Sequence, residues 1–236
     1  MEKNRIYNIL KLLICLVFFF SLNDISSLIL KLLNINSLSN KENVILQFIL
    51  SLVLVLFTTI LYINTIKKDY KKLKNNLSKN ISLIIKYFII FTILKYSVSF
   101  LSVIILTIFK YDTTNIISNN QNLIQEYIKA SPILMFISVS FLGPYYEEIL
   151  FRLSFKKVIT NKYLYIIISG TLFGLLHIFP LSDGITLILG IIQSISYVVM
   201  GIYFSYIYYK TDNIFISMGL HLLNNLLSVI MMLNML

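Results

Sequence analysis

Long runs of apolar residues, separated by short clusters of lysine and asparagine, make up most of this chain. A helix needs about 20 apolar residues to cross the roughly 30 Å of a bilayer's hydrocarbon core. The pattern therefore predicts an all-α, polytopic transmembrane helical bundle of about seven spans, with a range of six to eight. The predicted spans lie at 6–22, 44–64, 81–109, 131–152, 163–180, 184–209 and 214–235.

Three segments need separate treatment. The N-terminus has the basic start and apolar centre of a signal peptide, but no small-residue cleavage site follows, so we expect a retained first span. Residues 25–33 (ISSLILKLL) are too short to span and fit an interfacial helix. The run at 81–109 contains Lys86 and Lys95, which must snorkel or face protein.

The positions of lysine and arginine predict the orientation of the spans. These residues flank the first span, fill the segment 67–80 (KKDYKKLKNNLSKN), and follow the fourth and sixth spans. Under the positive-inside rule, seven spans with a cytoplasmic N-terminus and an outside C-terminus satisfy every cluster. We therefore expect a multi-pass protein of a bacterial-type cell membrane, in which 67–80 is a basic cytoplasmic loop that faces anionic lipid.

That basic segment also suggests a division of the chain. Residues 1–80 would hold the N-terminal pair of spans with the loop, and residues 81–236 a C-terminal membrane core. Nearly all polar residues within the predicted spans fall in the second part. The catalytic or binding function is therefore expected there.

Composition supports a membrane protein and narrows its partners. Hydrophobic residues make up 58% of the chain and charged residues only 13%, which lies far from soluble globular usage. The net charge of +10 does not indicate a nucleic-acid partner, because the cations lie in short clusters between apolar runs. The single cysteine, Cys15, rules out an intrachain disulfide and is expected to be a small buried hydrophobe.

The stretch GPYYEEILFR, residues 143–152, places three charges in a predicted span. An ionisable side chain there costs at least a few kcal/mol, so each needs a partner or a function. Glu148 and Arg152 are four residues apart and share a helix face, which favours an ion pair. Glu147 is turned about 100° away and is left unneutralised, as suits a general base. In the alternative, both glutamates only bracket Arg152.

Two further polar motifs contain the chain's only histidines. In FGLLH, Phe173 and His177 share a face, and Gly174 permits close helix approach. In HLLNN, His221 and Asn225 share a face, whereas Asn224 lies off it. Taken singly, each motif fits interhelical hydrogen bonding.

Considered together, the three motifs are more economically explained by one polar site. A carboxylate base, a histidine that orients water and a His/Asn pair beside a developing oxyanion form the inventory of an amide hydrolase.

In this order, EEILFR, FGLLH and HLLNN resemble the signature motifs of the CAAX protease and bacteriocin-processing family, the type II CAAX prenyl endopeptidases. The resemblance covers roughly residues 131–227. It implies an intramembrane glutamic endopeptidase with catalytic Glu147, His177, His221 and Asn225. Glu147 with His177 would activate water, and His221 with Asn225 would stabilise the oxyanion. The supporting residues would be Glu148, Arg152 and Phe173. Leu153 departs from the glycine that many relatives carry.

The resemblance also bears on cofactor and substrate. Two histidines and two carboxylates could ligate zinc, but the chain lacks a His-Glu-x-x-His arrangement, so a mechanism without a metal cofactor is favoured. The implied substrate is a membrane-associated peptide or protein, in bacterial peptide maturation or bacteriocin self-immunity.

Helix geometry raises one difficulty for a shared site. With straight spans, Glu147 and His177 would differ in depth by roughly 10 to 15 Å, too far to share a water. A helix break at Gly143-Pro144 would bring them closer, because proline is tolerated in a first helical turn and disrupts a helix interior. We therefore expect a new helix to start near 144, with 131–142 as a separate segment.

Two other functions fit the same residues. A non-catalytic membrane scaffold or immunity protein would bind a peptide or partner through the same cavity. A transporter would use Glu147 and the histidines as a proton relay, although no internal repeat supports it.

Overall fold

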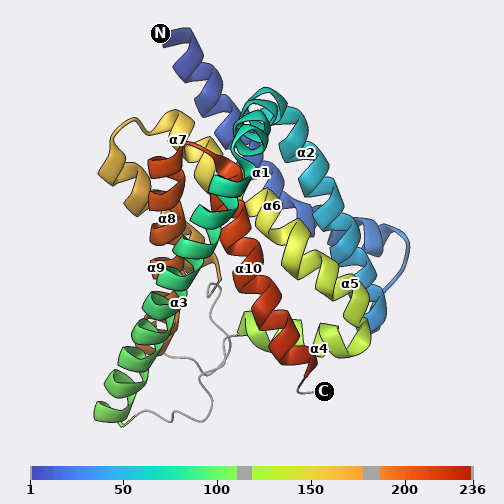
Figure 1. The fold of residues 1–236 in the computed structure, drawn as a ribbon. Helices are drawn as coiled ribbons and strands as arrows, with labels where there is room; N and C mark the ends of the chain where they lie inside the picture. Colours follow the sequence, from blue (N-terminus) through green and yellow to red (C-terminus); the bar gives the residue numbers. More distant parts are fainter. Residues whose placement is uncertain (1, 111–118, 178–186, 235–236) are drawn as a thin grey trace.

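The computed structural model describes residues 2–110, 119–177 and 187–234, and every regular element in these ranges is a helix (Figure 1). The predicted all-α class is thus confirmed. The helices before the three polar motifs are α1 (Glu2–Leu32), α2 (Asn40–Asn75), α3 (Leu77–Ile108) and α4 (Asn119–Ala130). A composite helix then joins α5 (Pro132–Ile137), η1 (Ser138–Leu142), α6 (Gly143–Glu147), η2 (Glu148–Ser154) and α7 (Phe155–Val158). The last three are α8 (Lys162–Leu176), α9 (Leu187–Thr211) and α10 (Ile214–Leu233).

Among the described residues, six helices are long and apolar enough to cross a membrane: α1, α2, α3, the composite helix, α9 and α10. This number agrees with the predicted polytopic bundle of six to eight spans. The seventh predicted span, 163–180, corresponds to α8, which has only 15 residues. The end of that predicted span and the start of the next lie outside the described residues.

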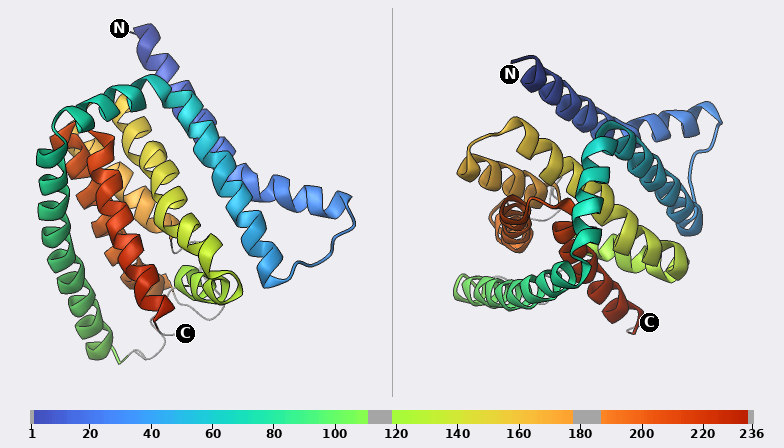
Figure 2. Two further views of the ribbon diagram at one scale, coloured as in Figure 1. Left: turned by 45° about the vertical axis from the view of Figure 1, so that its right-hand side comes forward. Right: turned by 45° about the horizontal axis from the view of Figure 1, so that its top comes forward.

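The basic segment 67–80 is not a loop, as the sequence predicted, but mostly helix. Helix α2 bends at Tyr62 (φ −116°, ψ 15°) and continues to Asn75, and its last part crosses the end of the bundle in Figure 2. Asp69 on this part is 3% exposed and accepts a hydrogen bond from the Ile214 backbone N–H at 3.1 Å. The segment is ordered because it caps the start of α10, a contact that the local sequence cannot reveal.

The expected helix break at Gly143-Pro144 is also wrong, because helical backbone angles continue through it. The preceding turn, η1, widens into a π-helix in which the Gly143 N–H bonds to the Ser138 carbonyl, five residues back. The extra residue in the turn accommodates a proline, which lacks an N–H and would clash in a regular α-helix. A second π-helical turn, η2, holds Glu148 and Arg152.

Close packing of α8 on α9 sets the position of the second motif. A Cβ on Gly174 would lie 2.4 Å from the Val198 Cα, and one on Gly170 would lie 2.4 Å from the Ile202 nitrogen. Side chains at either position would force the helices apart, so the predicted role of Gly174 in close approach is confirmed. Cys15 is 1% exposed, as expected for a small buried hydrophobe.

The C-terminal helices are buried in the bundle, whereas α3 faces outward. In its most apolar window, 44% of α10 is buried inside the protein, compared with 11% of α3. Figure 1 shows α10 in the middle of the helices and α3 along one side. The polar motif on α10 is thus surrounded by protein on several sides, which is where an intramembrane polar site can be tolerated.

Candidate active site

A cavity of about 950 Å³ lies between the composite helix, α3, α9 and α10. Four of its lining residues are the candidates with predicted catalytic roles: Glu147, His177, His221 and Asn225. The structure therefore brings together residues from three helices that are up to 78 positions apart in the sequence.

The adjacent glutamates have different surroundings. The Glu147 side chain is 18% exposed and lines the cavity, whereas that of Glu148 is fully buried behind it. Glu148 Oε1 lies 3.5 Å from Arg152 Nη2, so the predicted ion pair forms. Glu147 is consequently the carboxylate of the two that a substrate or water in the cavity can reach.

His221 contacts both glutamates through its two ring nitrogens. Its Nδ1 lies 3.1 Å from Glu148 Oε1, and its Nε2 lies 3.7 Å from Glu147 Oε2. Because a carboxylate only accepts hydrogen bonds, Glu148 fixes the proton of His221 on Nδ1. With Nδ1 held by Glu148, the Nε2 edge of His221 faces Glu147 and the cavity.

Phe173 links the two histidines and the buried arginine. Its ring centroid is 4.5 Å from that of His177 and 5.6 Å from that of His221. The Arg152 guanidinium carbon lies 4.2 Å from the same centroid, in cation–π geometry. One fully buried aromatic side chain thus sets the spacing of three polar groups.

His177 is the C-cap of α8 and reaches the cavity without any break in the composite helix. At 1.5 Å per residue, the 15 residues of α8 span roughly 22 Å, less than the bilayer core. The composite helix continues to Val158, 11 residues past Glu147 and so roughly 16 Å along the helix axis. Measured from the turn that joins the two helices, Glu147 and His177 then differ in depth by only about 6 Å, which resolves the difficulty. His177 Nδ1 donates to the Phe173 carbonyl at 2.8 Å, which leaves Nε2 as an acceptor in the neutral ring.

Asn225 is tied to the π-helical turn before Glu147. Its Nδ2 donates to the Val139 carbonyl at 2.9 Å. In the π-helical pattern that carbonyl would accept from residue 144, but Pro144 has no N–H. Asn225 replaces the missing donor and so joins α10 to the helix that carries Glu147. Its amide has a second N–H, which is the hydrogen available for an oxyanion.

Sequence reasoning missed two contributors to this network. Lys95 of α3 lines the cavity and donates to Asn224 Oδ1 at 2.8 Å. Asn224, which the sequence ranked as the weaker amide, is buried and donates to Asn225 Oδ1 at 3.1 Å. The one available signal was that a lysine in the middle of a predicted span must face either protein or the headgroups.

The described side chains around the cavity were also compared with the ligand sets of metal sites. Among the residues that the structure describes, no group of three or more histidine, cysteine, aspartate or glutamate side chains has the arrangement of a metal site. The two nitrogens of His221 lie on different sides of the ring and approach different glutamates, so they cannot converge on one ion.

Comparisons with known proteins agree with the motifs. Residues 129–227 match the family model described as type II CAAX prenyl endopeptidase Rce1-like, so the predicted resemblance is confirmed for this part of the chain. A Bacillus subtilis (strain 168) protein named "Putative membrane peptidase YdiL" is 33% identical over 123 residues, which cover 49% of this chain and 44% of that protein. The chain thus matches less than half the length of this relative. No solved structure matches it.

Proposed function

We propose, from the Rce1-like match of residues 129–227, that this protein is an intramembrane CAAX-type endopeptidase in which Glu147 activates a water molecule. The observation that carries the proposal is the arrangement of Glu147, His177 and His221 on one cavity, with Glu148 and Arg152 paired behind it. The substrate is a membrane-associated peptide or protein, processed in peptide maturation or bacteriocin self-immunity.

The first chemical step transfers a proton from water to the Glu147 carboxylate. His177 Nε2 accepts the other hydrogen bond of that water and orients it. The water oxygen then attacks the peptide carbonyl carbon, and the carbonyl π electrons move to oxygen. No metal is needed in this scheme, because the carboxylate supplies the base.

The tetrahedral intermediate carries a negative oxygen that needs hydrogen-bond donors. We assign the Nε2–H of a protonated His221 and the second Nδ2–H of Asn225 to this role. Collapse of the intermediate breaks the C–N bond, and Glu147 returns its proton to the departing amine. Glu148, held by Arg152 at 3.5 Å, accepts from His221 Nδ1 and so orients the imidazole ring.

The experiment is cleavage of a membrane-peptide library by the purified, detergent-solubilised protein. Glu147→Gln keeps the shape of the side chain but removes the base, so cleavage should fall about 10²- to 10⁴-fold. Glu126→Gln is the matched control, because Glu126 is an exposed glutamate on α4 outside the cavity. Expression and thermal melting of both variants should equal those of the wild type.

A chelator added in parallel tests the metal-independent scheme, which predicts unchanged rates. Loss of cleavage on chelation, restored by zinc, would replace it with a metal mechanism. Wild-type rates in Glu147→Gln would remove Glu147 as the base. Absence of wild-type cleavage across the whole library would favour the scaffold or immunity function instead.

A further inference from the structure

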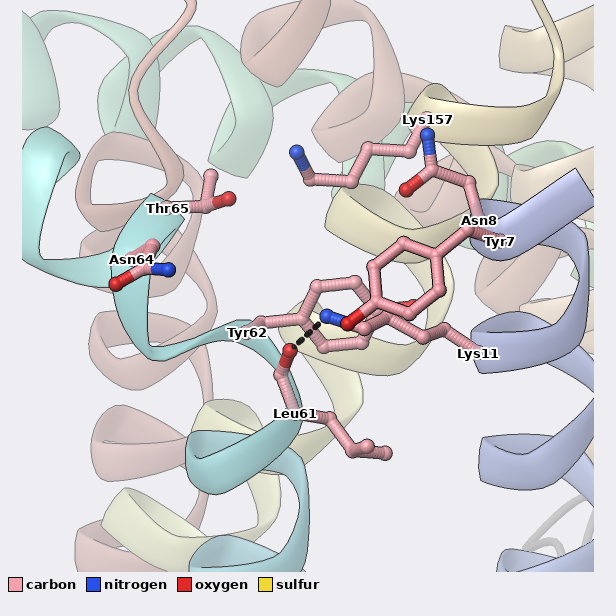
Figure 3. Close-up of a pocket in the computed structure, with 8 residues that line it drawn as sticks. All are labelled: Tyr7, Asn8, Lys11, Leu61, Tyr62, Asn64, Thr65 and Lys157. Carbon is pink, nitrogen blue, oxygen red and sulfur yellow. Dashed lines mark hydrogen bonds between the residues drawn. The ribbon is translucent and has the colours of Figure 1, made fainter. Parts of the chain in front are cut away.

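A second cavity, of about 280 Å³, lies where the first turns of α1 meet the bend of α2 and the end of α7 (Figure 3). It shares no lining residue with the cavity that holds Glu147. The bend at Tyr62 opens it, because the α2 backbone leaves its regular path there. Figures 1 and 2 place these segments at the end of the bundle where α1 begins and the basic part of α2 crosses.

The charged side chains that line this cavity are all cations. Lys11 and Lys157 contribute ammonium groups, and no aspartate or glutamate is among the eight lining residues. Lys11 Nζ donates to the Leu61 carbonyl at 2.6 Å and lies 4.5 Å from the Tyr7 ring centroid, so its position is fixed. Two like charges in a half-enclosed space repel each other, and an anion between them would relieve that repulsion.

Lys157 differs from its neighbour Lys156 in a way that points to a ligand. Lys156 is neutralised by Asp212 at 2.8 Å. Lys157 is half-buried, yet within the described ranges it has neither a hydrogen bond nor an ion pair to another residue. In Figure 3 its side chain extends across the cavity toward Thr65. Asp69 and Asp212 attract this ammonium group only from beyond ion-pair distance. A partly desolvated charge with no counter-charge in contact is costly unless something else supplies one.

The remaining lining groups fit a phosphate. Tyr7 and Thr65 carry hydroxyl groups and Asn8 an amide, all able to donate to oxygen, beside the two ammonium groups. The cavity also lies at the end of the bundle that carries most of the lysine clusters, which is the end expected at the headgroup level of an anionic leaflet.

We propose that this cavity binds a phosphate group, either in the headgroup of an anionic phospholipid or as free phosphate, with Lys157 and Lys11 as its cationic ligands. The proposal is independent of the peptidase function, because it involves none of the residues of that site.

Native mass spectrometry of the full chain in neutral detergent tests this site. The probes are phosphatidylglycerol and a diacylglycerol with the same acyl chains but no phosphate, followed by competition with inorganic phosphate. Lys157→Gln should bind phosphatidylglycerol about tenfold more weakly, the effect of losing one charge-assisted hydrogen bond. The double variant Lys71→Gln/Lys74→Gln removes two exposed cations near the same end of the bundle and should bind as the wild type does.

The two sources of phosphate give different results. Selective retention of phosphatidylglycerol that resists inorganic phosphate supports the lipid headgroup. Displacement by inorganic phosphate, together with a higher melting temperature in phosphate for the wild type but not for Lys157→Gln, supports free phosphate. Equal retention by wild type and Lys157→Gln, or an equal loss in the Lys71/Lys74 control, would overturn the proposal. Lys157→Gln carries the conclusion because its side chain has no described bond to lose, whereas Lys11 holds the α2 backbone.

Discussion

The neighbouring residues Glu147 and Glu148 have different surroundings because one helical step turns their side chains in different directions. Glu148 turns into the protein, where it contacts Arg152 and His221, while Glu147 turns toward the cavity. A buried carboxylate needs hydrogen bonds and a counter-charge, and Glu148 has both. Among the described residues, no lysine or arginine forms an ion pair with Glu147, which interacts with the Tyr146 side chain and lies 3.7 Å from His221 Nε2. It can therefore exchange protons with a substrate or water.

Lys95 is the residue whose role in this site can be tested most directly. Its bond to Asn224 holds the amide chain that runs through Asn225 to Val139. Lys95→Met keeps the side-chain length and removes the donor, so we expect cleavage to fall about tenfold, mainly in kcat. Steady-state kinetics would measure this fall in kcat. Lys95→Arg, which keeps a donor, should recover part of the lost kcat.

Lys86→Met is the control for this prediction, because Lys86 is an exposed lysine on the same helix that does not line the cavity. It should leave kcat and KM unchanged. The interpretation of Lys95 as a positioning residue would fail if the two methionine variants lost activity equally.

At the scale of elements, π-helical turns let the composite helix present Glu147 while keeping its backbone paired. In each π-helical turn, one backbone carbonyl accepts a hydrogen bond from a side chain of a neighbouring helix. Asn225 of α10 donates to Val139 in η1, and Ser169 of α8 donates to Phe151 in η2 at 2.6 Å. Such turns are frequent at functional sites because they redirect side chains within a continuous helix. The helices that carry the two histidines therefore also hold the helix that carries Glu147.

The contact between α8 and α9 is the element-level feature most sensitive to substitution. A methyl group at Gly174 would meet the backbone of Val198 at 2.4 Å, so the helices must separate and His177 must move. Gly174→Ala is expected to lower the melting temperature and to reduce cleavage at least about tenfold. Thermal melting and the cleavage assay would check both effects.

Gly219→Ala is the matched control on α10. A methyl group there would meet the end of the flexible Ile84 side chain at 2.8 Å, which can rotate away. Gly219→Ala should therefore lower the melting temperature and the cleavage rate less than Gly174→Ala does. Equal effects of the two alanines would mean that the α8–α9 spacing does not set the position of His177.

At the scale of the whole molecule, one charged cluster joins segments that are distant in sequence. Asp212, in the turn between α9 and α10, lies 2.7 Å from Lys72 Nζ of α2 and 2.8 Å from Lys156 Nζ of α7. Partial burial acts to raise the pKa of Asp212, but hydrogen bonds from Lys156 and Lys72 outweigh it and lower that pKa to about 2. The bent end of α2 is thus linked to α7 and to the turn between α9 and α10.

This cluster predicts a pH dependence with a definite sign. The folded pKa of Asp212 lies below the ordinary value of about 3.9, so its stabilising effect is complete above about pH 4 and is lost as the pH falls through about 2. Asp212→Asn should lower the melting temperature at neutral pH, and the difference from wild type should shrink between about pH 4 and pH 2. Asparagine tolerates the positive φ of 47° at this position, so the variant isolates the charge.

Added salt should also narrow the difference, because the Asp212 side chain is 67% exposed and its ion pairs are screened. A difference that stays constant from pH 7 to pH 2 would show that the Asp212 charge contributes nothing to stability.

What the sequence determined by itself follows from local physics. Apolar run length fixes which segments can cross a bilayer, and helical periodicity fixes which residues share a face, so the all-α bundle, the Glu148–Arg152 pair and the Gly174 contact were predictable. The three motifs also predicted the resemblance that the Rce1-like family model shows over residues 129–227.

Three features depended on contacts between residues that are distant in the sequence, and only the tertiary structure showed them. Pro144 predicted a break because proline lacks an N–H. Instead, a π-helical turn accommodates the proline ring, and Asn225, 81 positions later, donates the hydrogen bond that Pro144 cannot. The lysine-rich segment predicted a loop because it is polar, but Asp69 within it caps α10. Lys95 entered the site because α3 packs beside α10, an arrangement that depends on the whole bundle and is not encoded in any one helix.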